Sequence, residues 1–113
     1  MNDLIRPSLY DAYHAIVPVT IDDSRSEHLY DVVGPVSETG DTFAKQRSIQ
    51  ETKDSELIAI QSAGAYGAVM GSNYNTRALP AEIMVRGAQH AAIRQRQDSQ
   101  PIINDDIIPN WLD

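Results

Sequence analysis

The sequence predicts a mainly β domain, of either the barrel or the sandwich type. Short runs rich in β-branched and aromatic residues recur along the chain, turn-forming residues separate them, and no long helical pattern interrupts them. With 113 residues, 42% of them hydrophobic and 22% charged, the chain has the size and composition of one globular domain. The absence of cysteine excludes a disulfide scaffold, a thiolate zinc site and a cysteine nucleophile.

Strand candidates follow one another along the chain, each bounded by turn chemistry. Pro18 pushes the first of them towards a sheet edge or a bulge, because proline donates no ladder hydrogen bond. In order, the candidates are His14–Ile21, His28–Val36, Ser55–Ala63 and Ala81–Arg86. The segment His90–Arg96 suits either a further strand or a short helix.

The remaining segments are expected to be turns and short helical turns. Residues 3–13 form a turn-rich opening, since the proline after Arg6 biases that residue towards extended backbone. Single helical turns are expected over Thr42–Ile49 and Ala68–Tyr74. The last apolar run, Ile107–Leu112, is expected to dock on the body of the protein.

Charge narrows the classes of partner. Nine basic and sixteen acidic side chains leave a net charge of −7, which argues against nucleic acid and against an anionic membrane surface. The longest uncharged stretch, residues 57–76, contains glycine, serine, asparagine and glutamine and would insert poorly into a bilayer. We therefore expect neither a nucleic-acid nor a membrane partner, and a cytoplasmic location.

Known catalytic and metal motifs are missing from the chain. Its three histidines, His14, His28 and His90, are scattered and have no acidic partner at ligand spacing, so no metal site is expected. The chain has neither a phosphate-binding loop nor a nucleophile elbow. Gly64–Gly67 is weak evidence for a ligand loop, and a tight turn is the favoured alternative.

Two segments carry more chemistry than a turn needs. Arg6 and Tyr10 place a guanidinium and a phenol beside a chain bend, and arginine is the best side chain for gripping a carboxylate through two hydrogen bonds. Gly34–Asp41 presents the hydroxyl of Ser37, the carboxylate of Glu38 and a second acid from one turn. From the residues alone, a surface salt bridge for Arg6 and plain turn chemistry for the second segment are the favoured alternatives.

Three signatures nevertheless resemble those of the diaminopimelate decarboxylases, in the order that the family has them. Residues 2–14 resemble its Arg-Pro-x-Leu-Tyr segment, and residues 31–41 resemble its Val-Val-Gly-Pro-x-Cys-Glu-Ser/Thr-Gly-Asp segment. The third signature is matched by Ala63–Gly67, Ser72–Arg77 and Pro80–Glu82. Together the matches extend over roughly residues 2–85.

The resemblance implies an enzyme that uses pyridoxal phosphate to remove one carboxyl group from meso-diaminopimelate, giving L-lysine and carbon dioxide. It also implies a fold that pairs an N-terminal (β/α)8 barrel, absent here, with a Greek-key-like C-terminal β-barrel. Residues 1–113 resemble most of that second domain, which recognises substrate and forms the dimer, with a variable tail over residues 96–113. The barrel is expected to be incomplete and to carry short helical turns. Met1 resembles a residue from within a longer protein, which suggests a fragment or a natural truncation.

Four residues match family positions that contact substrate or cofactor. By resemblance, Arg6 and Tyr10 bind the substrate carboxylate distant from the cofactor, and Glu38 holds the distal ammonium. Tyr66 matches a tyrosine that approaches both pyridoxal phosphate and substrate. In the family the segment of Glu38 enters the partner subunit's active site, so the resemblance implies a homodimer.

Two departures from the family bear on activity. Ser37 stands at the position of a cysteine thought to protonate the intermediate, and a thiol, with a pKa of about 8.5, delivers a proton more readily than an aliphatic hydroxyl. The Schiff-base lysine belongs to the absent barrel, and neither Lys45 nor Lys53 matches it. We therefore expect pyridoxal phosphate in the intact enzyme and no binding or turnover by this chain alone.

The sequence also allows other interpretations of the chain's function. The chain suits a standalone association or dimerisation module, or an inactive decarboxylase-like protein, although retention of Arg6, Tyr10, Glu38 and Tyr66 together disfavours lost activity. A carboxynorspermidine or arginine decarboxylase fits less well, because the Arg-Pro-x-Leu-Tyr segment suits a distal carboxylate. An incomplete barrel exposes a sheet edge, so a homo-oligomer or a complex with a barrel domain is expected.

Overall fold

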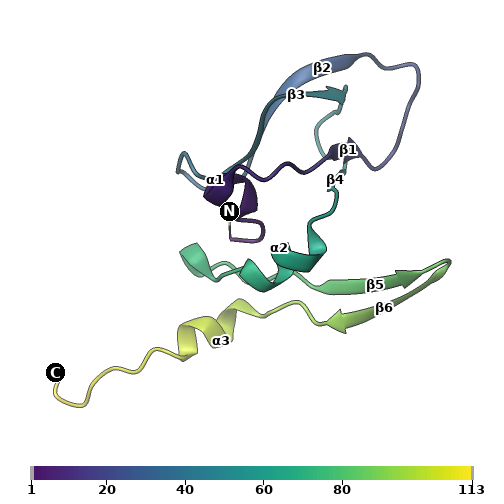
Figure 1. Cartoon of the computed structure of the whole chain (residues 1–113). Coiled ribbons are helices and arrows are strands. Elements are labelled where there is room, and N and C mark those ends of the chain that lie inside the picture. The colour runs from purple at the N-terminus through teal and green to yellow at the C-terminus, as the bar shows by residue number, and fades with distance from the viewer. Residues whose placement is uncertain (1, 113) are drawn as a thin grey trace. The chain divides into compact units, whose positions relative to one another are not determined.

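The computed structural model describes residues 2–112, which fall into two compact units (Figure 1). The first unit comprises residues 3–70, and the second comprises residue 2 and residues 71–112. The expected domain, 1–113, and its tail, 96–113, extend by their end residues outside the described part of the chain.

Short strands dominate both units, which confirms the predicted mainly β class with few short helices. The first unit contains α1 (Arg6–Tyr10), β1 (Ile16–Pro18), β2 (Glu27–Val33), β3 (Thr42–Gln50), β4 (Ile58–Ile60) and α2 (Gly64–Met70). The second contains the 3-10 turn η1 (Tyr74–Thr76), β5 (Glu82–Arg86), β6 (Gln89–Arg94) and α3 (Ser99–Asn104). Within residues 2–112, no helix has both the length and the apolar character needed to cross a membrane.

The strands pair as three antiparallel two-stranded sheets, β1–β4, β2–β3 and β5–β6. Over the described residues these sheets do not close into a barrel, and their pairing does not establish a Greek-key order. β1 pairs with β4 from Ile16 opposite Ile60 to Pro18 opposite Ile58. Pro18 therefore lies in a strand that has one partner within residues 2–112, in keeping with the expected sheet edge.

The prediction of a helical turn over Thr42–Ile49 is wrong, because these residues form most of β3. They pair with residues 28–33 of β2, and the small core of the first unit buries Ala44 and Ile49 beside Ile16. Alanine, lysine, glutamine and arginine favour a helix locally. Pairing with β2, to which β3 is joined by the loop of residues 34–41, and burial outweigh that preference.

A bulge bends the β2–β3 hairpin at Gln46, which has a φ of +47°. The backbone N–H of Gln46 donates to Oδ1 of Asp31 at 2.8 Å, and its side-chain amide donates to the same oxygen at 3.1 Å. The backbone hydrogen bond is the main cause that lowers the pKa of Asp31 below its usual range. Asp31 therefore stabilises the one left-handed residue of the strand.

Two helical predictions also need correction. Residues 3–13 were expected to be turns, yet they contain α1, where Pro7 occupies the first turn and costs no hydrogen bond. A left-handed Asp11, with a φ of +63°, ends that helix. The helix expected over Ala68–Tyr74 lies earlier, at Gly64–Met70, so the glycines expected to form a tight turn are helical instead.

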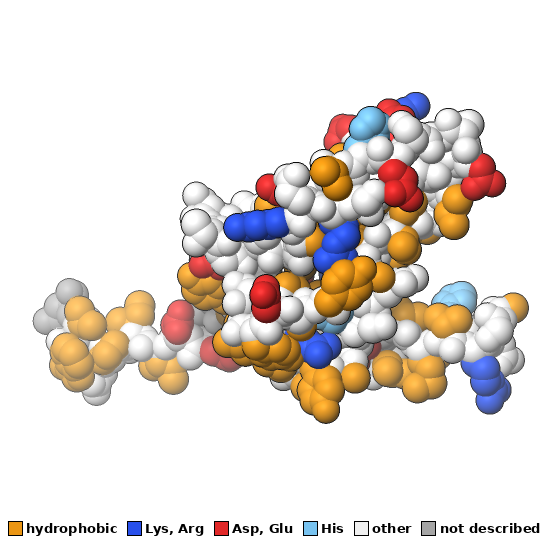
Figure 2. Space-filling model, turned by 45° about the horizontal axis from the view of Figure 1, so that its top comes forward, with side chains coloured by type: hydrophobic (Ala, Val, Ile, Leu, Met, Phe, Trp, Pro, Cys, Tyr) orange, Lys and Arg blue, Asp and Glu red, His pale blue; other side chains and the backbone are white. Residues whose placement is uncertain are grey.

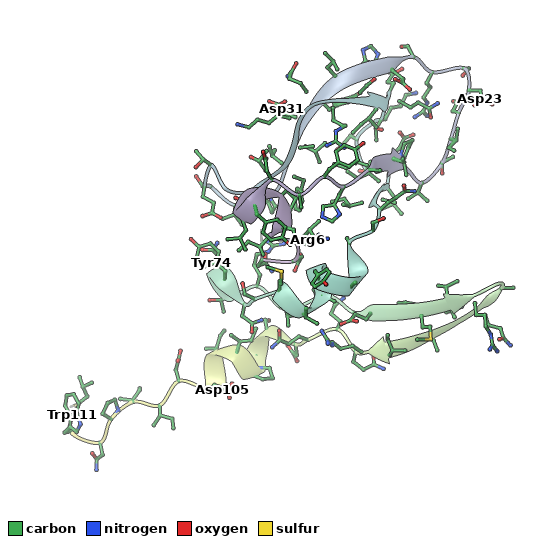
Figure 3. The ribbon with its side chains drawn as sticks, in the orientation of Figure 1. Arg6, Asp23, Asp31, Tyr74, Asp105 and Trp111 are labelled. Atoms are coloured by element: carbon green, nitrogen blue, oxygen red, sulfur yellow. The ribbon has the colours of Figure 1, made fainter. Side chains whose placement is uncertain are left out.

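The second unit is built on the β5–β6 hairpin, so the strand alternative for His90–Arg96 holds over residues 89–94. Gly87, with a φ of +58°, takes the first position of its two-residue turn. Figure 2 shows hydrophobic side chains in orange along this hairpin, and Ile83, Met84 and Val85 are all more than half exposed. The tail does not dock within the second unit, because Trp111, labelled at its far end in Figure 3, is 77% exposed.

An ion pair fastens the loop after β1 to the turn before β4, and it predicts a pH-dependent stability. Arg25 grips Glu56 through Nη1–Oε2 at 2.7 Å and Nη2–Oε1 at 2.9 Å, which lowers the pKa of Glu56 from 4.5 to about 2. Because the folded pKa is the lower one, this pair stabilises the fold above pH 4.5 and is lost as the pH falls towards 2. Glu56→Gln is therefore expected to unfold at lower urea concentration than the parent near neutral pH.

The same urea titration repeated in acid provides the control. The difference between Glu56→Gln and the parent is expected to shrink as the pH falls, since protonated Glu56 and glutamine are both neutral. A difference in unfolding midpoint that stays constant from neutral pH down to a pH of about 2 would contradict this reading of the pair.

Candidate functional site

α1 places Arg6 and Tyr10 on one face, because residues four apart in a helix are neighbours. The Nε–H of Arg6 donates to the Tyr10 hydroxyl at 2.6 Å. That hydroxyl in turn donates to Sδ of Met70, on α2, at 3.9 Å. The hydrogen bond to Tyr10 engages the Nε–H of the guanidinium and fixes the plane of that group.

Tyr66, on α2, completes a cluster around the guanidinium of Arg6, the residue labelled near α1 in Figure 3. The Cζ atom of Arg6 lies 5.3 Å from the ring centroid of Tyr66 and 5.6 Å from that of Tyr10. Both distances suit a cation–π contact, worth about 0.5–1 kcal/mol at an exposed site. The two rings are more than half exposed, so a ligand can reach the guanidinium between them.

Arg6 has no acidic partner among residues 2–112. This contradicts the surface salt bridge that the sequence allowed, although the chain carries sixteen acidic residues. A guanidinium held by two phenols keeps its capacity for a two-pronged carboxylate contact. The cluster of Arg6, Tyr10 and Tyr66, called the Arg6 cluster below, is thus chemically suited to bind an anion.

The loop between β2 and β3 carries Ser37 and Glu38, both exposed. Its second acid, Asp41, has a different role, because it is only 2% exposed and its Oδ2 accepts the N–H of Val36 at 2.7 Å. Gly34 donates its N–H to the carbonyl of Asp41 at 2.8 Å. Asp41 therefore anchors the loop rather than presenting a charge to a ligand.

Sequence reasoning missed this anchoring role. The signal lay in Gly34, since a Cβ at that position would overlap the Asp41 carboxylate. A second glycine, Gly40, lets the loop approach α1: a Cβ there would lie 3.2 Å from Oγ of Ser8 and 3.6 Å from Oε1 of Glu38. Glu38 thus lies on the side of the loop that neighbours Ser8.

The five residues selected from the sequence form two groups. The structure brings Arg6, Tyr10 and Tyr66 together, although Tyr10 and Tyr66 are 56 positions apart in the sequence. The other two residues, Ser37 and Glu38, lie in the loop between β2 and β3. Residues 2–112 contain no gathering of three histidine, aspartate or glutamate side chains that would hold a metal ion.

Comparison with known proteins defines the class of protein to which the chain belongs. Residues 1–64 match the family described as "Pyridoxal-dependent decarboxylase, C-terminal sheet domain". The chain therefore belongs to the pyridoxal-dependent decarboxylases, through their C-terminal sheet domain. Tyr66 lies just beyond the matched residues.

Two of the similar curated proteins are diaminopimelate decarboxylases. The chain is 54% identical to the diaminopimelate decarboxylase of Zymomonas mobilis over 112 residues, which is 99% of this chain and 26% of that protein. It is 47% identical to the diaminopimelate decarboxylase of Aquifex aeolicus over 103 residues, 91% of this chain and 24% of that protein. The chain thus spans about a quarter of the length of the relatives that it matches.

Solved structures agree in fold. A diaminopimelate decarboxylase from M. jannaschii superimposes with a TM-score of 0.89 at 31% identity, covering 97% of this chain and 25% of that one. The Helicobacter pylori enzyme, solved in complex with L-lysine, gives a TM-score of 0.82 at 39% identity, covering 92% of this chain and 25% of the other. The resemblance seen in the sequence is therefore confirmed over nearly the whole chain.

Proposed function

We propose that this chain is the C-terminal domain of a diaminopimelate decarboxylase and supplies substrate-binding residues to its active site. The observation that carries the proposal is the Arg6 cluster, in which a guanidinium without an acidic partner among residues 2–112 lies between two exposed phenols. In the proposed role, Arg6 and Tyr10 bind the distal carboxylate of meso-diaminopimelate. The relatives' activity and the lysine bound to the H. pylori enzyme support this choice of substrate.

The charges of the substrate fit separate binding roles for Arg6 and Glu38. The distal end of diaminopimelate is a zwitterion and needs one cation and one anion at a fixed separation. Arg6 provides the cation, and Glu38, in the separate loop, provides the anion for the distal ammonium. We propose that Glu38, which is exposed in its own loop, acts in the active site of a second subunit, so that the enzyme works as a homodimer.

Pyridoxal phosphate belongs to the intact enzyme in this proposal. When bound, it accepts the electron pair left by the departing carbon dioxide. Tyr66 is the residue of this chain that faces it, and an exposed ring suits contact with a flat heterocycle. The chain's two lysines do not fit the Schiff base, since Lys45 is on β3 and Lys53 lies in a turn, both outside the Arg6 cluster. A binding site for the cofactor therefore needs residues beyond this chain.

The fold supports an association role within the same proposal. The three two-stranded sheets leave many large apolar side chains exposed, and a lone pair of strands is marginally stable in water. We propose that these three sheets form a Greek-key-like barrel together with further residues of the enzyme. The second candidate, a standalone dimerisation module, rests on the same exposed surface. The cytoplasmic location stays a prediction, as does a proton-donating role for Ser37.

A chimera tests the proposal. In it, this chain replaces the matching C-terminal quarter of the A. aeolicus decarboxylase, and release of carbon dioxide from meso-diaminopimelate is measured with added pyridoxal phosphate. We expect turnover by the chimera and none by the chain alone. A chimera that folds, dimerises and binds the cofactor but releases no carbon dioxide would overturn the proposal and favour the association module.

A further inference from the structure

His14 is a buried titratable residue that the proposed function does not use. It lies between α1 and β1, is 3% exposed, and its Nδ1 lies 3.0 Å from the carbonyl oxygen of Gln61. The backbone reinforces the contact, because the N–H of Gln61 donates to the carbonyl of Ala15 at 2.8 Å. Nη1 of Arg47 donates to the carbonyl of His14 at 2.7 Å, which holds the residue from the side of β3.

The partner of Nδ1 determines which nitrogen carries the proton. A carbonyl oxygen only accepts hydrogen bonds, so Nδ1 is the protonated nitrogen and donates to Gln61. The other nitrogen, Nε2, is buried and has no partner among the described residues. Leaving a buried nitrogen unpaired costs free energy. The contribution of this histidine to the stability of the fold therefore comes from the hydrogen bond that its Nδ1–H donates.

The position of this hydrogen bond gives it a structural consequence. His14 follows the end of α1 by four residues, and Gln61 precedes the start of α2 by three. A second contact involves the same helices: a Cβ at Gly67 of α2 would lie 3.0 Å from Cδ1 of Leu4, just before α1. Two contacts, one before α1 in the chain and one after it, thus fix α1 against α2.

We infer that His14 is a positioning residue that sets the spacing of α1 and α2, and through it the 5.3 Å contact between Arg6 and the ring of Tyr66. The importance of that spacing for substrate rests on the proposed function. The spacing itself is a property of the first unit. It is read from the NMR resonance of the Arg6 Nε–H, which the two tyrosine rings displace from its unfolded position.

Three substitutions at position 14 separate the effect of the hydrogen-bond donor's position from the effect of side-chain size. Asparagine at position 14 places an amide N–H near the position of Nδ1, whereas glutamine places it near Nε2 and alanine has no donor. We expect His14→Asn to keep the displaced Arg6 resonance, and His14→Gln and His14→Ala to lose most of the displacement. The matched control is His90→Asn, a change at an exposed histidine on β6, which is expected to leave the resonance in place.

The outcomes decide the inference without any activity measurement. A folded His14→Ala chain with the parental Arg6 resonance would overturn it, as would loss of the displacement in His14→Asn. Rescue by glutamine rather than asparagine would also overturn it, since Nε2 would then be the working atom. If His14→Ala does not fold, the asparagine and glutamine pair gives the answer. An inactive chimera would contradict the proposed function, but it would not change the conclusion about His14 drawn from the Arg6 resonance.

Discussion

Arg6→Ala in the A. aeolicus chimera is expected to lower kcat/KM for meso-diaminopimelate by about a hundredfold to a thousandfold. The reason is the loss of a two-pronged contact to the distal carboxylate, in which the charge-assisted hydrogen bonds together contribute about 3–4 kcal/mol. Arg6→Lys is expected to recover about tenfold of that loss, because an ammonium restores the charge but not the planar fork. Steady-state kinetics with pyridoxal phosphate in excess measures both variants.

Arg96 provides the matched control for this prediction. It is an exposed arginine that also carries one positive charge, and it lies outside the Arg6 cluster. Arg96→Ala removes the same charge, so a nonspecific electrostatic effect would appear in both variants. Equal losses in Arg6→Ala and Arg96→Ala, or a kcat/KM of the Arg6 variant close to that of the parent, would refute a direct contact with substrate.

Gly34→Ala is expected to lower the free energy of unfolding by about 2–4 kcal/mol, which is a large effect for one methyl group. The new Cβ would overlap the carboxylate of Asp41, and that carboxylate is buried and accepts the N–H of Val36 at 2.7 Å. Relieving the overlap breaks a charge-assisted hydrogen bond in a buried place. Urea unfolding of the chain measures the cost.

Gly64→Ala is the companion change. Gly64 begins α2, and a Cβ there would have no atom within 4 Å, so alanine is expected to be neutral or slightly stabilising through its better helix propensity. Since Gly34 supports the loop of Ser37 and Glu38, Gly34→Ala is also expected to make that loop sensitive to proteolysis. Similar stabilities for the two alanine variants would contradict the role given to Asp41.

The sequence predicted those features whose cause is local. Arg6 and Tyr10 were selected from a motif of neighbouring residues, although the helix α1 that brings them together was expected to be a turn. Turn chemistry likewise revealed the loop of Ser37 and Glu38. The class was predictable for the same reason, because β-branched runs and turn residues are read within short windows.

Features with a long-range cause escaped prediction. β3 consists of residues that favour a helix locally and becomes a strand only through its pairing with β2. Tyr66 joins Arg6 because Gly67 allows Leu4 to pack closely against α2, a contact between residues 63 positions apart. In the second unit, Gln97 likewise joins residues that are distant in the sequence, because its Oε1 accepts hydrogen bonds from the side-chain amide of Asn73 and from the N–H of Leu79. Such pairs leave no pattern in a single sequence.

The central claim is that the Arg6 cluster recognises a distal carboxylate. The most direct measurement is the ratio of kcat/KM for meso-diaminopimelate to that for L-ornithine, an amino acid with a distal ammonium and no distal carboxylate, in the chimera and in its Arg6→Ala variant. We predict a high ratio that collapses in the variant, mainly through loss of activity on meso-diaminopimelate. A ratio that Arg6→Ala leaves unchanged would contradict the claim, because the cluster would then contribute nothing that distinguishes the two substrates.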